Sequence, residues 1–150
     1  MIKQQIEQDL KTALLGGDKD RVMTLRGLKS AILYAEVAGG LREKGLPEDE
    51  VIALLAKEAK KRQESADLYT QGGSADRAAA ELAEKEIIET YLPAKLSDEE
   101  LKQIVEKAVT GTGAASIQQM GQVIAAVKKE TQGAADGARI AQLVKERLAQ

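Results

Sequence analysis

Apolar residues at helical spacing, interrupted by glycine pairs and prolines, constrain this chain more than any other feature. The first segment shows the pattern, with an apolar residue at every fourth position before a Gly16-Gly17 pair: Ile2, Ile6, Leu10 and Leu14. This spacing places the apolar side chains on one face of an α-helix, and the glycines end it. Almost nothing in the chain alternates with the two-residue period of a strand. The sequence therefore predicts an all-α protein.

Three more helices are expected before residue 93, each with a recognisable start. Asp18 is positioned to cap a helix that ends at Gly39-Gly40. Pro47 opens a longer helix at a first-turn position, followed by acidic residues that favour the positive end of the helix dipole. Ser74 is positioned to cap a fourth helix, which Pro93 ends because proline lacks the N–H group that a helix needs.

Pro93 is also the best candidate for a boundary, because a complete new start signal follows it. Ser97 to Glu100 forms a capping box that opens a helix expected to break at Gly111-Thr112-Gly113. A second capping box is expected at Ser116 to Gln119, and Asp136 is positioned to cap the last helix. We therefore expect two helical bundles: a four-helix unit over residues 1–93 and a three-helix unit over residues 94–150.

Several common kinds of chemistry are excluded by composition. The chain has no histidine, cysteine, tryptophan or phenylalanine and only three tyrosines. It therefore lacks an imidazole base, a thiolate nucleophile, the usual ligands of zinc or iron–sulfur sites, and aromatic platforms on which single-stranded nucleic acids stack. We expect no catalytic activity of its own, no cofactor and no bound metal.

The charge balance allows only a local basic surface. There are 22 basic and 24 acidic residues, for a net charge of −2, which is unlike a strongly basic nucleic-acid-binding protein. The N-terminus carries Lys3 and Glu7 where a signal peptide needs an apolar run. Glycine and glutamine interrupt the longest uncharged stretch, residues 108–127, so it is not a membrane span. The expected location is the cytoplasm, without a membrane partner.

Two groups of basic residues lie in the N-terminal half. Lys57, Lys60 and Lys61 share one side of the third helix, and Arg26 with Lys29 lies on the second. Both groups are candidate RNA or phosphate contacts. The alternatives are a solvated face supported by a Glu58–Arg62 pair, and ion pairs of the second-helix cations with acidic residues of the bundle: Asp18, Asp20 and Glu36.

The tail contains a third basic group around a glycine turn. The turn from Gly133 to Gly137 brings the start of the last helix toward the end of the preceding one, where a phosphate finds free backbone N–H groups and lysines. The candidate phosphate contacts, besides the two glycines, are Lys128, Lys129, Arg139, Lys145 and Arg147. The alternative is a plain interhelical turn in which the Asp136 carboxylate already occupies those N–H groups.

Carboxylates are the remaining side chains that could take part in catalysis. Glu58, Glu81 and Glu84 can face one another across the third and fourth helices and hold Mg²⁺, as in an all-α hydrolase. The spacing is common, and Glu81 with Lys85 is equally an ordinary stabilising pair.

The chain resembles the YqeY-like, GatB/YqeY domain family over nearly its whole length. The resemblance rests on short motifs in five places: Arg21, Leu25-Arg26 and Ala31-Ile32; Lys57-Glu58 through Ser65; Tyr91-Leu92-Pro93; Met120-Gly121; and Gly133 with Asp136-Gly137. It implies an all-α protein similar to the tail of the GatB subunit of the glutamine-dependent aspartyl/glutamyl-tRNA amidotransferase. That tail is associated with tRNA recognition, whereas carbon–nitrogen ligase activity with glutamine as amido donor belongs to the larger enzyme.

Three functions from different classes remain open at this point. The preferred one is a noncatalytic accessory protein that binds tRNA or another structured RNA. The second is an adaptor that grips a helix of a protein partner in an apolar groove. The third is the Mg²⁺-dependent hydrolase, which requires Glu58, Glu81 and Glu84 to converge at metal-ligand distance.

Overall fold

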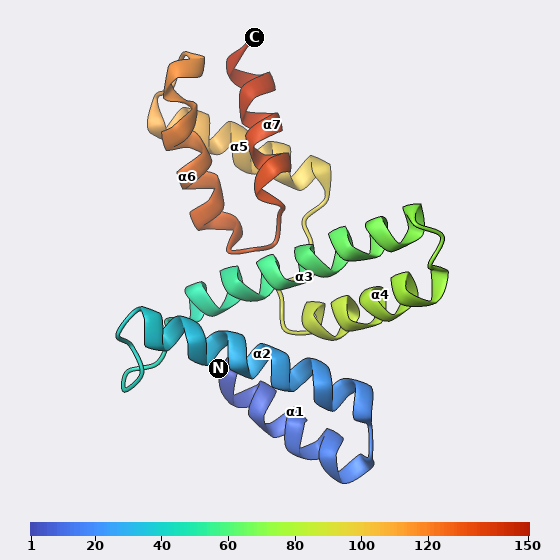
Figure 1. Cartoon of the computed structure of the whole chain (residues 1–150). Coiled ribbons are helices and arrows are strands. Elements are labelled where there is room, and N and C mark those ends of the chain that lie inside the picture. The colour runs from blue at the N-terminus through green and yellow to red at the C-terminus, as the bar shows by residue number, and fades with distance from the viewer. The chain divides into compact units, whose positions relative to one another are not determined.

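The computed structural model describes all 150 residues, and every regular element in it is helical. Seven α-helices and one 3₁₀ turn follow one another along the chain (Figure 1): α1 (Ile2–Gly16), α2 (Lys19–Ala38), α3 (Glu48–Gln71), α4 (Ala75–Glu89), α5 (Asp98–Thr112), η1 (Ile117–Gln119), α6 (Met120–Thr131) and α7 (Gly137–Leu148). The prediction of an all-α protein is confirmed. None of the helices is both long and apolar enough to span a membrane.

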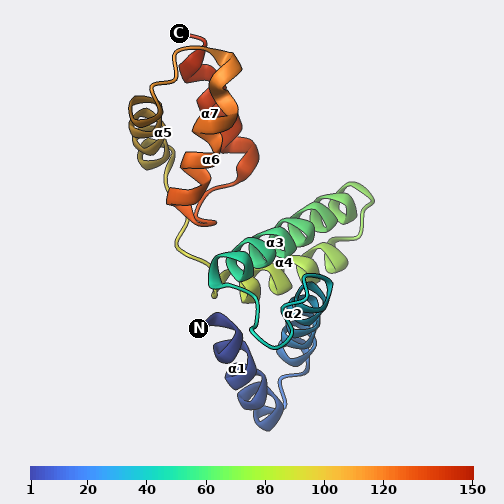
Figure 2. The same cartoon turned by 90° about the vertical axis from the view of Figure 1, so that its left-hand side faces the viewer.

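Internal contacts divide the chain into two compact units, Met1–Leu92 and Pro93–Gln150. The first contains α1 to α4 and the second contains α5 to α7 (Figures 1 and 2). Each unit has its own cluster of buried apolar residues. The division into a four-helix bundle over residues 1–93 and a three-helix bundle over residues 94–150 stays a prediction.

The first unit consists of two helical hairpins. α1 packs against α2, α3 packs along α4, and α2 also contacts α4, an arrangement visible in both views (Figures 1 and 2). The core lies where the hairpins meet, and its largest members are almost fully buried: Leu25, Leu28 and Ile32 of α2, Leu55 of α3 and Ile88 of α4. These residues fall at the helical intervals that the sequence shows.

The second unit is smaller, and α6 packs against both α5 and α7. Its core is built mainly from branched aliphatic side chains, of which the most buried are Val105, Val123, Val127, Ile140 and Val144. The backbone N–H of Leu96 donates a hydrogen bond to the carbonyl of Ala134 at 2.9 Å. This bond holds the segment before α5 against the turn between α6 and α7.

Two of the expected helix starts form as predicted. The Asp18 carboxylate accepts a hydrogen bond from the Arg21 N–H at 3.1 Å. Ser97 and Glu100 form the full capping box, in which the Glu100 N–H donates to Ser97 Oγ at 3.2 Å and the Ser97 N–H donates to the Glu100 carboxylate at 2.8 Å. Each cap satisfies N–H groups that have no partner within the helix.

Other boundary predictions are wrong in detail. Gly111 lies within α5, which continues to Thr112 and ends at Gly113, a glycine in the left-handed conformation with φ of +67°. The expected capping box after it does not form: the Gln119 side chain accepts from the Ala115 N–H at 2.8 Å and from Ser116 Oγ at 3.5 Å, and the Ser116 side chain makes no capping hydrogen bond to the backbone. The chain therefore passes through one 3₁₀ turn before α6 begins.

Ser74 and Asp136 occupy the expected N-cap positions of α4 and α7 without acting as expected. Neither side chain makes a capping hydrogen bond to its helix. Similarly, Pro47 is the N-cap of α3 and precedes the first turn, which the three acidic residues Glu48 to Glu50 occupy. Sequence spacing places these starts to within a residue, but it does not determine which polar atom satisfies each backbone group.

A buried carboxylate joins three parts of the first unit. Glu36 of α2 is only 1% exposed, and its Oε1 accepts hydrogen bonds from Lys3 Nζ at 2.7 Å and from the Leu46 N–H at 3.1 Å. These bonds connect α1, α2 and the segment before α3. The bond from Lys3 holds the pKa of Glu36 below its ordinary value, and this effect outweighs the opposing effect of burial.

A second buried polar contact ties the end of the first unit to its beginning. The Tyr91 hydroxyl donates a hydrogen bond to Asp9 Oδ2 at 2.6 Å, and Arg21 Nη2 lies 3.8 Å from the same oxygen. Burial and the Asp9 carboxylate raise the pKa of Tyr91 well above its ordinary value. The other tyrosines, Tyr34 and Tyr69, also lie in this unit, on α2 and α3.

Candidate functional site

The turn between α6 and α7 brings basic side chains to a helix N-terminus. Lys128 and Lys129 lie in the last turn of α6. The chain then reverses through two residues in the left-handed conformation, Gln132 with φ of +45° and Gly133 with φ of +85°. Gly137 is the first residue of α7. Glycine suits the second of these positions because it adopts a positive φ without strain.

Lys128 lies directly against the start of α7. A Cβ atom built on Gly137 would stand 3.5 Å from Lys128 Cε and 3.6 Å from Lys128 Nζ. The ammonium group is therefore beside the positive end of the helix dipole, where the first backbone N–H groups have no partner within the helix. Asp136 makes no capping hydrogen bond to α7, so the expectation that its carboxylate occupies those N–H groups is wrong, whereas a plain interhelical turn stays an alternative. A cation beside such N–H groups is suited to an anion such as phosphate.

Two other predicted contacts of the tail are engaged in ion pairs with α5. Arg139 donates to both oxygens of Asp98, at 3.1 and 2.7 Å, and Arg147 likewise donates to both oxygens of Glu106, from Nη2 at 2.9 Å. These bonds hold the pKa values of both carboxyl groups below their ordinary range. These ion pairs use Nε and Nη2 of each arginine and so reduce the donors left for a phosphate, whereas Lys145 is exposed in the last turn of α7.

The lysine face of α3 is exposed, which agrees both with an RNA contact and with a solvated surface. Lys57, Lys60 and Lys61 all point to the surface. Lys61 Nζ lies 3.0 Å from Glu58 Oε1, and Arg62 pairs with the same glutamate at 3.5 Å, so the expected Glu58–Arg62 pair is confirmed.

The cations of α2 do not have the expected partners. Lys29 Nζ lies 3.4 Å from Glu7 Oε1 on α1, and Glu36 pairs with Lys3. Arg26 is exposed and takes part in no ion pair. Lys29 therefore does pair with an acidic residue of the bundle, but the partners named for these two cations, Asp18, Asp20 and Glu36, are wrong.

The three carboxylates considered for Mg²⁺ do converge, but around a guanidinium group. Arg62 lies 3.5 Å from Glu58, 3.8 Å from Glu81 and 2.7 Å from Glu84. No group of three acidic side chains in the structure is arranged to hold a metal ion. Lys85 pairs with Glu89 at 3.6 Å, so the expected Glu81–Lys85 pair is also absent. The geometry makes this cluster a connection between α3 and α4.

One surface is not indicated by the motifs of the sequence. Between α1 and α2, Leu14 and Met23 are exposed beside a groove. A signal for this surface exists in the sequence, since Met23, Leu33 and Val37 are large apolar residues of α2 outside its core stripe. From periodicity alone, such residues are interpreted as part of a wide apolar face that packs in the core, so they are not recognised as an exposed surface.

The sequence of this chain was compared with models of known protein families and with curated proteins. The family model described as "Yqey-like protein" matches residues 3–148, which is nearly the whole chain. A search of curated proteins gave no match. Of the residues that carry the resemblance, Leu25 and Ile32 lie in the core, and Arg21 and Tyr91 share the contact with Asp9. The extent of the match shows that this chain belongs to the Yqey-like protein family.

Proposed function

We propose that this chain is a noncatalytic accessory protein that binds tRNA through the turn between α6 and α7. The observation that carries the proposal is the position of Lys128 against Gly137, with its ammonium group at the N-terminus of α7. The resemblance to the tRNA-associated GatB tail supports the choice of RNA as the anion. Any ligase chemistry belongs to a separate enzyme, for which this protein would position the RNA in the cytoplasm.

The charge of the protein limits how many phosphates it contacts. With a net charge of −2, binding depends on a local basic surface. Lys128 and Lys129 are the central contacts in this proposal, with Lys145 as a further one on α7. The exposed cations of the first unit, Arg26 and the lysine face of α3, are secondary candidates. Since Arg139 and Arg147 tie α7 to α5, their role is to hold the turn in place.

Salt-dependent binding of tRNA to the full chain tests the proposal. Each phosphate contact contributes about 0.9 to the slope of log affinity against log salt. We expect Lys128→Gln and Lys129→Gln each to lower the slope by about that amount, measured by fluorescence anisotropy with labelled tRNA. Lys107→Gln is the matched control, because Lys107 is an exposed lysine of the same unit that pairs with Glu130 at 3.3 Å; its slope should not change.

Two results would contradict this function. One is the absence of tRNA binding at low salt. The other is a slope that stays the same in the Lys128→Gln and Lys129→Gln variants, because binding would then depend on a different surface.

A further inference from the structure

We propose that the groove between α1 and α2 is a docking site for an acidic amphipathic helix of a protein partner. This site lies in the first unit and is independent of the α6–α7 turn. Three features lead to the proposal: the apolar lining of the groove, further exposed apolar residues on α2, and the sign of the charges that line the groove.

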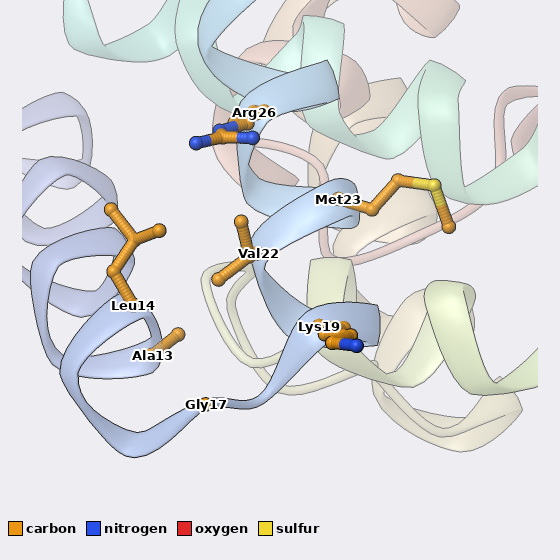
Figure 3. Close-up of a pocket in the computed structure, with 7 residues that line it drawn as sticks. All are labelled: Ala13, Leu14, Gly17, Lys19, Val22, Met23 and Arg26. Carbon is orange, nitrogen blue, oxygen red and sulfur yellow. The ribbon is translucent and has the colours of Figure 1, made fainter.

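The groove has a buried apolar floor and an exposed apolar residue, Leu14, on its α1 side, while the Met23 side chain that also lines it from α2 is directed away from α1 (Figure 3). It has a volume of about 510 Å³ and is lined by seven residues (Figure 3): Ala13, Leu14, Gly17, Lys19, Val22, Met23 and Arg26. Ala13 and Val22 are buried, whereas Leu14 is 49% exposed and Met23 is 63% exposed. Figure 3 shows the Leu14, Val22 and Arg26 side chains pointing toward the space between the two helices. A partner's apolar side chain placed there would cover exposed apolar surface.

Further along α2, beyond the exposed polar residues Arg26, Lys29 and Ser30, large apolar side chains are exposed again. Leu33 and Val37, one turn apart, are 46% and 57% exposed, while the core of α2 is formed by other positions. From Met23 to Val37 the helix rises about 21 Å, at about 1.5 Å per residue. That length matches a partner helix of about four turns with apolar residues at intervals of three and four.

Every charged residue that lines the groove is basic. Lys19 and Arg26 are both exposed, and neither takes part in an ion pair. The next cation along α2 differs, because Lys29 is paired with Glu7. A partner helix with carboxylates beside its apolar residues would therefore complement both the shape and the charge of the groove. Phosphate would leave the apolar floor uncovered, and the groove has no aromatic ring on which a base could stack.

Selection from a library of displayed helical peptides tests the partner chemistry. The bait is the full chain, and the library randomises one face of an 18-residue helix. We expect the selected peptides to combine apolar residues at positions i, i+4 and i+7 with flanking Asp or Glu. A library that yields no binder, or binders that are neutral or basic, would overturn the proposal.

Substitutions at exposed positions then locate the binding surface. The affinity of the chain for a labelled selected peptide is measured by fluorescence anisotropy. We expect Met23→Ser and Leu14→Ser each to weaken this affinity at least 5-fold. Leu68→Ser is the matched control, since Leu68 of α3 is a 67% exposed leucine in the same unit. The double variant Lys19→Glu and Arg26→Glu should weaken binding at least 10-fold and should prefer the peptide with its acidic residues changed to lysine.

Two further outcomes would assign the surface to a different occupant. If Met23→Ser abolishes a concentration-dependent dimer in light scattering, the occupant is a second copy of this chain and the proposal fails. The proposal also fails if Arg26→Glu leaves peptide binding unchanged and weakens tRNA binding, because the occupant of this surface would then be RNA. If the proposal holds, Lys128→Gln leaves peptide affinity unchanged whatever it does to tRNA affinity, so the groove and the proposed function are tested separately.

Discussion

Glu36 is the one charged side chain that this fold buries almost completely, and Lys3 supplies the compensating charge. Removing one partner of such a pair leaves the other with an unmet requirement for charge or hydrogen bonding. Glu36→Gln keeps an oxygen for the Leu46 N–H and loses the charge that faces Lys3. We expect it to lower the free energy of unfolding by about 2 kcal/mol, measured by urea denaturation at pH 7.

The same residue predicts a pH dependence of stability. The folded pKa of Glu36 lies below its ordinary value of 4.5, so the unfolded chain binds more protons in acid. The stabilisation by Glu36 is therefore present above about pH 4.5 and lost as the pH falls through the folded pKa. The difference in unfolding free energy between the wild type and Glu36→Gln should shrink between pH 5 and pH 3. A constant difference would show that the charge of Glu36 is not what stabilises the fold.

Two glycines of the same turn should respond differently to substitution by alanine. Gly133 has a φ of +85°, so Gly133→Ala places a Cβ in the left-handed region and should cost about 1–2 kcal/mol of stability. At Gly137 a Cβ meets Lys128 at ordinary van der Waals distance, so Gly137→Ala should change stability by less than about 0.5 kcal/mol. Thermal unfolding of the two variants measures the contrast, and equal losses would contradict it.

Individual contacts were less predictable from sequence than the residues that make them. The spacing of Glu58 and Arg62 predicts their pair because both lie on one helix. Lys3 and Glu36 are separated by 33 residues, and the sequence contains no signal that joins them. The same limit applies to Arg139 and Arg147, whose partners on α5 depend on how the helices pack. Close spacing allows a pair to be predicted but does not ensure it, since Lys85 pairs with Glu89 and not with the equally close Glu81.

At the scale of elements, Arg62 joins α3 to α4 through three carboxylates. Arg62→Met would leave Glu58, Glu81 and Glu84 facing one another without the cation between them. We expect a loss of about 1–2 kcal/mol in unfolding free energy, measured by urea denaturation. Lys61→Met is the control, because its pair with Glu58 is more exposed and should be worth less than about 0.5 kcal/mol. Equal effects of the two changes would show that Arg62 is an ordinary surface residue.

The helices themselves were predictable because their signals are local. Apolar spacing, Asp18 and the Ser97 capping box lie within a few residues of the feature that they determine. One error occurs where two local signals compete. Gly111 carries the signal of a helix end, but α5 continues past it because Gly113 provides the left-handed turn that ends the helix. The prediction of a phosphate site at the turn between α6 and α7 also rests on local signals, since its glycines and lysines are close together in sequence.

At the scale of the whole molecule, each unit has a core of its own. We expect residues 1–93 and residues 94–150, produced separately, each to be helical by circular dichroism and to unfold cooperatively. The second fragment has a size at which many domains still fold alone. A fragment that is unfolded in isolation would show that its core depends on the rest of the chain.

The placement of the tyrosines gives the two units different optical properties. Tyr34, Tyr69 and Tyr91 all lie in the first unit, and the chain has no tryptophan or phenylalanine. Intrinsic fluorescence and near-ultraviolet absorbance therefore originate in the first unit alone, while far-ultraviolet circular dichroism reports both. Comparing the two signals during unfolding separates the melting of one unit from that of the other in the intact protein, without a label or a cut in the chain.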